Sequence, residues 1–248
     1  MKRPEWLQWS LSLVHVVVSY FMMLPIAILF FPYALVSRNG AFAACKTWCH
    51  VTLWLARVLC GLKTEVRGTP PTGEVLICAK HQSFLDIILI FKSVPRGRFI
   101  MKRELLWAPI LGQYALWIGC IPVARGRRAE AIRKMLDGVR KGRIDPGQLI
   151  IYPQGTRIPP GVKAPYKVGA AVLYQELGQP CVPVACNVGL FWPKKGVMRR
   201  PGLAVVEFLD PIPPGLPPEE FRTLLEERIE TRSNELMREA GFDPDKAA

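Results

Sequence analysis

The sequence predicts an α/β fold, in which a mixed sheet is flanked by helices and an N-terminal helical segment anchors the chain to a membrane. Three observations support this prediction. Short apolar runs alternate with segments of helical periodicity, as in α/β domains. The chain has 248 residues, half of them hydrophobic, which is enough for one domain with a large core. A stretch of 32 residues, from Trp6 to Ser37, contains no Asp, Glu, Lys or Arg.

The predicted anchor is a helical hairpin in residues 1–62, and residues 63–248 form the predicted α/β domain. A helix needs about 20 apolar residues to cross the hydrocarbon layer, and the uncharged stretch exceeds that length. A second segment, Ala41–Leu62, is amphipathic and carries tryptophans, which suit the membrane interface. We expect the hairpin to bend near Pro25 or Pro32, and either to dip into one leaflet or to span the membrane and return. The alternative is one plain spanning helix, which would put the N-terminus and the main domain on opposite sides.

Beyond the anchor, predicted strands and helices follow one another along the chain. Short runs of apolar residues bounded by turn residues predict strands. These runs are Val75–Ala79, Gly97–Met101, part of Trp117–Val123, Gln148–Tyr152, Cys181–Asn187 and Leu203–Leu209. Segments in which apolar residues recur at helical spacing predict helices. These segments are Ser83–Phe91, Leu105–Gly112, Glu130–Lys141, Val168–Leu177 and the charged terminal segment Glu219–Ala240.

The balance of charge indicates an anionic partner. Lys and Arg number 33 against 20 Asp and Glu, which gives a formal net charge of +13. Nucleic acid and acidic membrane are the usual partners of such a surface. The apolar N-terminus favours the lipid bilayer, because a basic protein with a lipid anchor gains from both forces. No zinc-finger spacing or RNA-binding signature is present, so we expect no nucleic acid.

The seven cysteines indicate a reducing compartment, since their number is odd, none forms a C-x-x-C pair and several lie in apolar runs. Cys45, Cys49 and His50 lie close together in the sequence, which raises the question of a metal site. No second pair of ligands accompanies them, and a structural zinc site needs four ligands. Packing inside a helix is the favoured interpretation, so no metal site is predicted.

The strongest local signal is K-H-Q-S-F-L-D, residues 80–86. On one continuous helix, residues five apart are rotated by about 140°, so His81 and Asp86 would not face each other. A strand-to-helix turn solves this, with Ser83 capping the helix and Asp86 pointing back toward the imidazole. A neutral histidine oriented by a carboxylate is a competent general base. The alternative is a capping box, in which Ser83 and Asp86 only stabilise the start of the helix.

Three further segments carry weaker signals. Residues 150–157, I-I-Y-P-Q-G-T-R, place Gly155–Arg157 after a strand, where backbone amides, a hydroxyl and a guanidinium suit an anion. An ordinary turn with a solvated arginine is the alternative. Residues 119–125, G-C-I-P-V-A-R, form an apolar strand that ends in arginine, and residues 181–185, C-V-P-V-A, predict a buried strand.

Taken together and in this order, these four segments resemble the glycerolipid acyltransferase family, specifically the bacterial 1-acyl-glycerol-3-phosphate acyltransferases. That family carries N-H-x-S-x-x-D, a strand ending in Arg, F-P-E-G-T-R and V-P-V/I, and the resemblance runs over residues 74–209. It implies a glycerol-3-phosphate acyltransferase-like fold, with His81 as the base that deprotonates the acceptor hydroxyl and Asp86 as its orienting partner. It also implies a substrate phosphate pocket made of Lys102, Arg125, Gly155, Thr156 and Arg157.

The implied reaction moves a fatty acyl chain from acyl-CoA or acyl carrier protein to the sn-2 hydroxyl of lysophosphatidic acid, giving phosphatidic acid. Direct attack by that hydroxyl needs no enzyme nucleophile. No metal or redox cofactor is implied, and the thioester is a co-substrate. Acceptor and product lie in the membrane and the acyl donors are cytoplasmic. The implied location is therefore the cell inner membrane, with the catalytic domain facing the cytoplasm.

Two positions depart from the family pattern. Gln154 stands where the family has Glu, and an amide cannot act as a base, so we assign it no proton-transfer role. Ala124 stands where Asp often precedes the arginine, which weakens the case for a local ion pair there. Basic residues further along the chain are expected either to press the enzyme onto anionic lipid or to be solvated: Lys194, Lys195, Arg199 and Arg200.

Two other functions stay open. A related acyltransferase would use another acceptor, such as a lyso-ornithine lipid or another lysophospholipid. A non-catalytic membrane adaptor would keep the fold and bind lipid, although it would have no reason to retain His81 and Asp86. A hydrolase would need a nucleophilic serine or cysteine, and no G-x-S-x-G segment is present.

Overall fold

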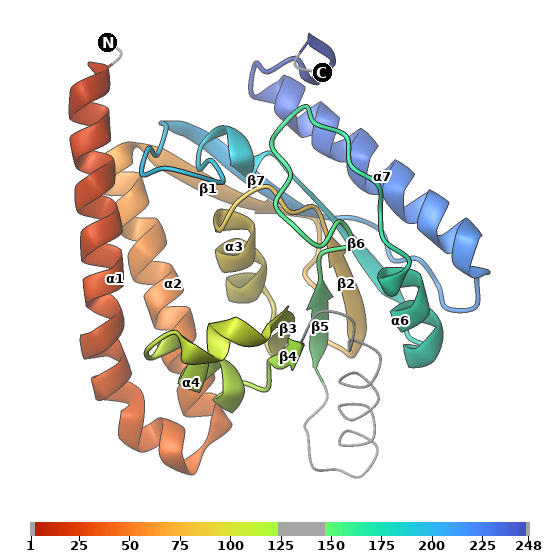
Figure 1. Cartoon of the computed structure of the whole chain (residues 1–248), viewed down its shortest axis with the longest axis horizontal. Coiled ribbons are helices and arrows are strands. Elements are labelled where there is room, and N and C mark those ends of the chain that lie inside the picture. The colour runs from red at the N-terminus through yellow and green to blue at the C-terminus, as the bar shows by residue number, and fades with distance from the viewer. Residues whose placement is uncertain (1–2, 124–146, 247–248) are drawn as a thin grey trace.

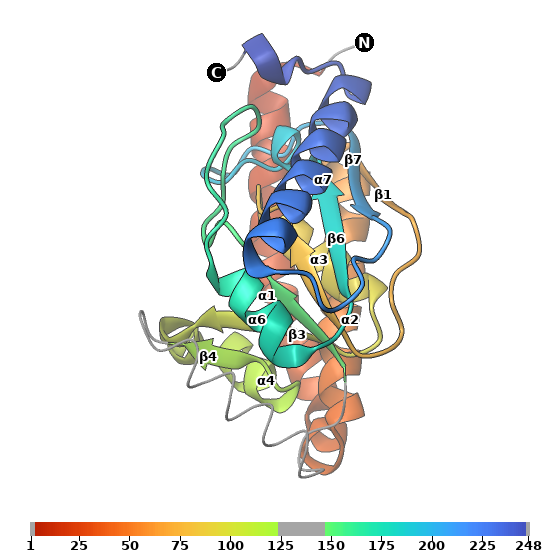
Figure 2. The ribbon, with the colours of Figure 1, turned by 90° about the vertical axis from the view of Figure 1, so that its right-hand side faces the viewer.

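The computed structural model describes residues 3–123 and 147–246. Within them, seven strands form one sheet in the order β1-β7-β6-β2-β5-β3-β4 (Figures 1 and 2). Neighbouring strands pair in parallel except β6 and β7, which are antiparallel, so the predicted mixed sheet is confirmed. The strands are β1 (Leu62–Arg67), β2 (Val75–Ala79), β3 (Gly97–Lys102), β4 (Ile121–Val123), β5 (Gln148–Ile151), β6 (Cys181–Cys186) and β7 (Gly202–Phe208).

Helices cover both faces of the sheet (Figure 1). One face carries α1 (Glu5–Val36), α2 (Arg38–Cys60), α3 (Leu85–Ser93) and α4 (Leu111–Trp117), and the other carries α6 (Gly169–Leu177) and α7 (Pro218–Glu239). Short 3₁₀ helices η1 (Arg103–Trp107), η2 (Val188–Leu190) and η3 (Pro244–Lys246) lie between or after these elements.

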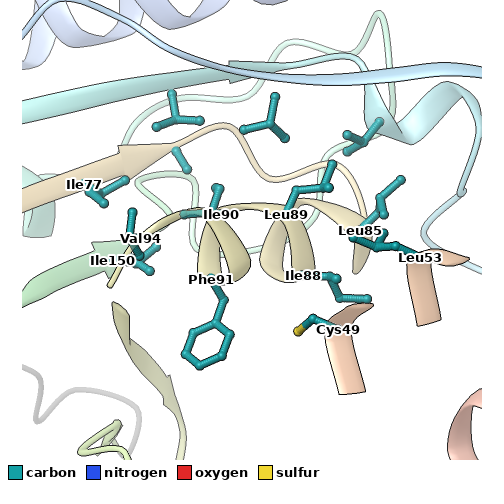
Figure 3. Packing of buried hydrophobic residues seen from close by; sticks show 14 of the residues in the cluster. Cys49, Leu53, Ile77, Leu85, Ile88, Leu89, Ile90, Phe91, Val94 and Ile150 are labelled. Carbon is teal, nitrogen blue, oxygen red and sulfur yellow. The ribbon is translucent and has the colours of Figure 1, made fainter. Parts of the chain in front are cut away.

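The core has two layers because successive side chains of a strand point to opposite faces. In β2, Ile77 packs with α2 and α3, whereas Leu76 packs with α6 and α7. Figure 3 shows α3 in the first layer, between Ile77 and Ile150 of the sheet and Cys49 and Leu53 of α2. All residues of β2, β5 and β6 are buried, as expected for strands covered on both faces.

The parallel pairing of β2 and β5 brings together the turns that follow these two strands. Ile77 of β2 is paired with Ile150 of β5, so the two strands end at the same edge of the sheet. The loops that follow them, after Ala79 and Ile151, therefore leave the sheet side by side. Ligands of open α/β sheets bind at such edges, beyond the carboxyl ends of the strands.

The two N-terminal helices run antiparallel and pack side by side (Figure 1). The chain reverses at Ser37, whose hydroxyl caps the start of α2. At Gly40, a Cβ would lie 2.4 Å from the carbonyl carbon of Tyr33, so glycine allows the second helix to start this close to the first. The hairpin reverses at Ser37 and not near Pro25 or Pro32, where the reversal was expected. The helix α1 continues through both prolines, because neighbouring groups can satisfy the backbone that a proline frees in an apolar helix.

Helix α1 buries a polar stripe and exposes an apolar face. Gln8, Ser12, His15 and Ser19 are all buried. The Ser12 hydroxyl accepts from the N–H of Arg199 at 2.9 Å, and Gln8 Nε2 donates to the carbonyl of Arg199 at 2.6 Å. The large exposed apolar side chains of the helix are Trp6, Trp9, Leu13, Val14, Val17, Tyr20, Phe21, Leu24, Ile28, Leu29, Phe31, Tyr33, Leu35 and Val36. This is the reverse of an amphipathic helix that faces water. Among the described helices, α1 alone has the length and composition to cross a membrane.

One strand of the structure was not predicted, one predicted helix is wrong, and one predicted helix is not described. The strand Leu62–Arg67 was not predicted, because it lies at the sheet edge and only its first residue is fully buried. The predicted helix Leu105–Gly112 is wrong, since η1 ends before Pro109 and α4 starts after it. Proline lacks the N–H that a continuous helix would need there. The predicted helix Glu130–Lys141 lies outside the described residues.

Candidate active site

The segment between β2 and α3 turns around the side chain of Asp86. His81 lies just beyond the end of β2, and Asp86 lies in the first turn of α3. Nδ1 of His81 lies 2.9 Å from Oδ1 of Asp86. The backbone N–H groups of Gln82 and Ser83 donate to Oδ2 of the same carboxylate, at 2.9 and 2.7 Å. The strand-to-helix turn thus brings His81 and Asp86 into contact, as their spacing predicts.

The His81 contact and the capping contact of Asp86 occur together, because the two carboxylate oxygens have different partners. Oδ2 satisfies N–H groups ahead of the helix, as in a capping box, while Oδ1 contacts the imidazole. The Ser83 hydroxyl accepts from the N–H of Leu85 at 3.1 Å, and the helix starts at Leu85 rather than at Ser83. The Asp86 side chain is 0% exposed, and burial of a carboxylate is tolerable only with such partners.

The ring of Tyr152 fixes the plane of the imidazole. The two rings stack with centroids 3.9 Å apart and an interplanar angle of 21°. Burial raises the pKa of the Tyr152 hydroxyl and the charge of Asp86 raises it further, so the phenol stays protonated. Because the carboxylate favours a proton on Nδ1 of His81, Nε2 is the nitrogen left to accept one. Tyr152 is absent from the predicted site, although it directly follows β5, the parallel neighbour of β2.

The turn after β5 lies against the His81 segment. The N–H of Ile158 donates to the carbonyl of His81 at 2.8 Å, and the N–H of Gly155 donates to the carbonyl of Tyr152 at 2.9 Å. Gly155 has a φ of +71°, which strains residues with a side chain, and a Cβ there would lie 3.0 Å from Nζ of Lys167. Glycine therefore lets this tight turn close beside the histidine.

A cavity of about 580 Å³ adjoins these two turns. Its polar and cationic lining comes from His81, Lys102, Gly155, Thr156, Arg157 and Lys194. The rest of the lining is almost entirely apolar and comes mainly from α1, α2, α3, β3 and α4. Such a cavity suits a molecule that combines an anionic group with a long apolar chain.

The structure brings most of the predicted site residues to this cavity. His81, Lys102 and the triplet Gly155–Arg157 line it, and Asp86 contacts His81. Arg125, predicted to bind the substrate phosphate, lies outside the described residues. The His81 segment and the Gly155–Arg157 turn therefore meet at the edge where β2 and β5 end.

The structure shows the positions of three residues that the sequence analysis discussed but did not assign to the site. Gln154 is buried, and it is not among the described residues that line the cavity. Lys194 lines the cavity. Arg199 is buried, lies 3.9 Å from the ring centroid of Trp192 and donates to backbone carbonyls, so it does not reach out to lipid. Burial lowers the pKa of Arg199 to about 10.

Within residues 3–123 and 147–246, no group of three or more His, Cys, Asp or Glu side chains is placed to hold a metal ion. All seven cysteines lie in these ranges and are free thiols. Cys45 and Cys49 line the cavity among apolar neighbours. They are part of its wall and pack as small hydrophobic residues.

The chain is similar to known acyltransferases in sequence and in fold. Residues 63–187 match the family model described as Acyltransferase. The 1-acyl-sn-glycerol-3-phosphate acyltransferase of Pseudomonas aeruginosa is 31% identical over 163 residues, which cover 63% of this chain and 62% of that protein. The 1-acyl-sn-glycerol-3-phosphate acyltransferase alpha of Homo sapiens is 32% identical over 195 residues, which cover 75% of this chain and 68% of that one.

The crystal structure of the 1-acyl-sn-glycerophosphate acyltransferase PlsC from Thermotoga maritima has the same fold. It superimposes with a TM-score of 0.77 at 20% sequence identity, covering 92% of this chain and 97% of that one. By sequence, the chain spans less than two thirds of the length of the Pseudomonas relative.

Asp86→Ala should cost more stability than His81→Ala. Without the carboxylate, the N–H groups of Gln82 and Ser83 stay buried with no acceptor, and each unsatisfied group costs about 1–3 kcal/mol. We expect denaturant titration in mild detergent to show a loss of about 2–6 kcal/mol in the free energy of unfolding for Asp86→Ala, and less than half of that for His81→Ala. Equal losses would show that the capping role of Asp86 is wrong.

Proposed function

The chain belongs to the acyltransferase family, and we propose that it transfers a fatty acyl chain from a thioester to the sn-2 hydroxyl of 1-acyl-glycerol-3-phosphate. The product is phosphatidic acid. The donor is acyl-CoA or acyl carrier protein, which acts as co-substrate, and the reaction needs no metal or redox cofactor. One observation carries the proposal: a histidine held by a buried carboxylate stands in the wall of a largely apolar cavity that also has cationic residues.

In the proposed reaction, Nε2 of His81 accepts the proton of the lipid hydroxyl as the hydroxyl oxygen attacks the thioester carbonyl. A C–O bond forms, the C–S bond breaks, and the imidazolium gives its proton to the departing thiolate. Asp86 keeps the proton on Nδ1 and stabilises the imidazolium. Tyr152 limits the imidazole to one plane, so that Nε2 stays directed at the acceptor.

The cavity lining has a part suited to the phosphate of the lipid acceptor and a part suited to an acyl chain. The phosphate is assigned to the cationic and polar residues Lys102, Arg125, Gly155, Thr156 and Arg157. The four of these that the structure describes line the cavity, and Arg125 lies outside the described residues. The acyl chain is assigned to the apolar lining. A volume of about 580 Å³ lies within the usual size of ligand pockets.

The histidine carries the first test. Purified protein in mixed micelles, given lysophosphatidic acid and either acyl-CoA or an acyl carrier protein thioester, should form phosphatidic acid and release thiol in equal amounts. His81→Ala should lower this rate by about 10²–10⁴-fold, because general base catalysis contributes that much. The matched control is His50→Ala, since His50 is an exposed histidine on α2 and should keep wild-type activity.

Three results of this test would contradict the proposal. Thiol release without a lipid product would show that the acceptor or the class of reaction is wrong. Turnover only with another lysolipid in a panel would replace the acceptor. No turnover with any of these donors and lipids would favour a non-catalytic adaptor.

Arg157→Ala should weaken binding of the acceptor phosphate. Hydrogen bonds from a charged group contribute about 1.5–3 kcal/mol, so the KM for lysophosphatidic acid should rise by about 10- to 100-fold. The KM for the acyl donor should stay within about twofold, since the loss is confined to the acceptor. Lys63→Ala, which removes an exposed cation on β1, is the control. An unchanged KM for lysophosphatidic acid would exclude Arg157 from the phosphate pocket.

A membrane location follows from the surfaces that the fold leaves apolar. Beside the outer face of α1, the segment of η1 and α4 exposes Trp107 and Leu116, at 87% and 46% of their surface. This segment contacts the hairpin directly, because the Tyr114 hydroxyl donates to the carbonyl of Ala27 at 2.6 Å. Large exposed apolar surfaces are costly in water. We assign the outer face of α1 and the exposed side chains of η1 and α4 to contact with lipid at the cytoplasmic face of the inner membrane, where the thioester donors are available.

The hairpin predicts that the N-terminus and the main domain lie on one side of the membrane (Figure 1). Cysteines introduced at two exposed positions, Glu5→Cys and Glu227→Cys, report each side. We expect a membrane-impermeant maleimide to label neither in intact cells and both after permeabilisation. The unsubstituted protein is the control, since its own cysteines are buried or half-buried. Labelling of only one position in intact cells would indicate a single spanning helix.

A further inference from the structure

A buried ion pair lies directly behind the catalytic turn. Lys80, the residue before His81, is 3% exposed. Its Nζ lies 2.6 Å from both carboxylate oxygens of Glu230 in α7. A buried ammonium needs a paired carboxylate, because burial of an unpaired charge is strongly unfavourable. The C-terminal helix therefore supplies a group on which the end of β2 depends.

The same carboxylate holds the turn that follows β5. The Tyr166 hydroxyl donates to Glu230 at 2.9 Å, and Gln154 Nε2 lies 3.5 Å from the same oxygen. Gln154 Nε2 also donates to the carbonyl of Ala164 at 3.3 Å. Burial and the negative charge of Glu230 raise the pKa of Tyr166, which keeps it a donor. Gln154 directly precedes Gly155, so Glu230 connects the His81 segment with the proposed phosphate turn.

Neighbouring contacts fix α7 at this edge of the sheet. The Ser233 hydroxyl accepts from the N–H of Cys186 at 3.2 Å, and Gln82 Nε2 lies 3.7 Å from the sulfur of Met237. In Figures 1 and 2, α7 runs along the face of the sheet opposite α1 and α2. Of the described residues that line the cavity, none is Lys80, Gln154, Tyr166 or Glu230. These four residues act through their neighbours and do not touch the reacting atoms.

We propose that Glu230 is a positioning residue for acyl transfer, which rests on the function proposed above. Its carboxylate joins Lys80 and Gln154 and so sets the distance between the His81 base and the Gly155–Arg157 turn. The base and the phosphate turn must be fixed relative to each other, because the phosphate end of the acceptor determines where its hydroxyl lies. An error of about 1 Å in such a distance can cost about 100-fold in rate.

Glu230→Gln tests this role, because it removes the charge and keeps the shape. We expect phosphatidic acid formation to fall by about 10- to 100-fold. Released thiol should exceed the lipid product, because a misplaced acceptor lets water attack the thioester in its stead. A residue that only stabilises the fold would lower both products in proportion, with the loss of folded protein. The matched control is Glu235→Gln in the same helix, which removes an exposed partner of Arg232. It should leave the rate of transfer and the ratio of thiol to lipid product unchanged.

Two double variants keep the test decisive if Glu230→Gln folds poorly. Glu230→Gln/Gln154→Glu exchanges the carboxylate and the amide across their 3.5 Å contact, and it should restore much of the transfer and the equal yield of thiol and lipid. Lys80→Met/Glu230→Gln removes both charges. This variant should fold, but it should still release more thiol than it forms lipid product. If this second variant forms lipid and releases thiol in equal amounts at the wild-type rate, Glu230 only neutralises Lys80 and the positioning role is wrong.

The outcomes separate this inference from the proposed function. If wild-type protein forms no phosphatidic acid, the proposed function fails and the inference fails with it. If wild-type protein is active and Glu230→Gln transfers at the same rate with equal yields of thiol and lipid, the inference alone is overturned.

Discussion

The carboxylate of Asp86 is the interaction on which the site depends. Its two oxygens bind on different sides, one to the imidazole of His81 and the other to the backbone N–H groups of Gln82 and Ser83. The same side chain therefore caps the start of helix α3 and orients the imidazole of His81, the proposed base. Residues five apart do not face each other on one continuous helix, so the contact depends on the turn between β2 and α3. The ring of Tyr152 then leaves the imidazole one plane in which to lie.

The sheet determines the position of the turn between β2 and α3, and the helices on its two faces contact the site in different ways. Because β2 and β5 are parallel neighbours, the His81 segment and the Gly155 turn leave the sheet at one edge and share a hydrogen bond from Ile158 to His81. On one face, α1 and α2 enclose the apolar cavity and turn their own apolar surface outward. On the other face, α7 delivers Glu230 to the back of both turns. The proposed lipid side of the site is therefore the face covered by α1 and α2, whereas α7 contacts the two turns from the opposite face.

Sequence reasoning predicted what depends on local pattern and missed what depends on distant contacts. The strand Val75–Ala79 agrees to the residue, because a fully buried strand is apolar throughout. The edge strand Leu62–Arg67 was missed because it is only half-buried. Tyr152 and Glu230 could not be predicted as parts of the site, since only the pairing of strands and the packing of α7 bring them to it. Gln154 illustrates both cases. The sequence shows that its side chain has no basic group, but it does not show the contact with Glu230.

The most direct test of the central claim is the tautomer of His81. The protein has three histidines, so ¹⁵N NMR of histidine-labelled enzyme in detergent resolves few signals, and His81→Ala identifies the one of interest. We expect neutral His81 to carry its proton on Nδ1, with Nε2 unprotonated, and Asp86→Ala to remove that preference. A resting enzyme in which neutral His81 carries its proton on Nε2 would contradict the assignment of Nε2 as the base and of Asp86 as the group that orients it.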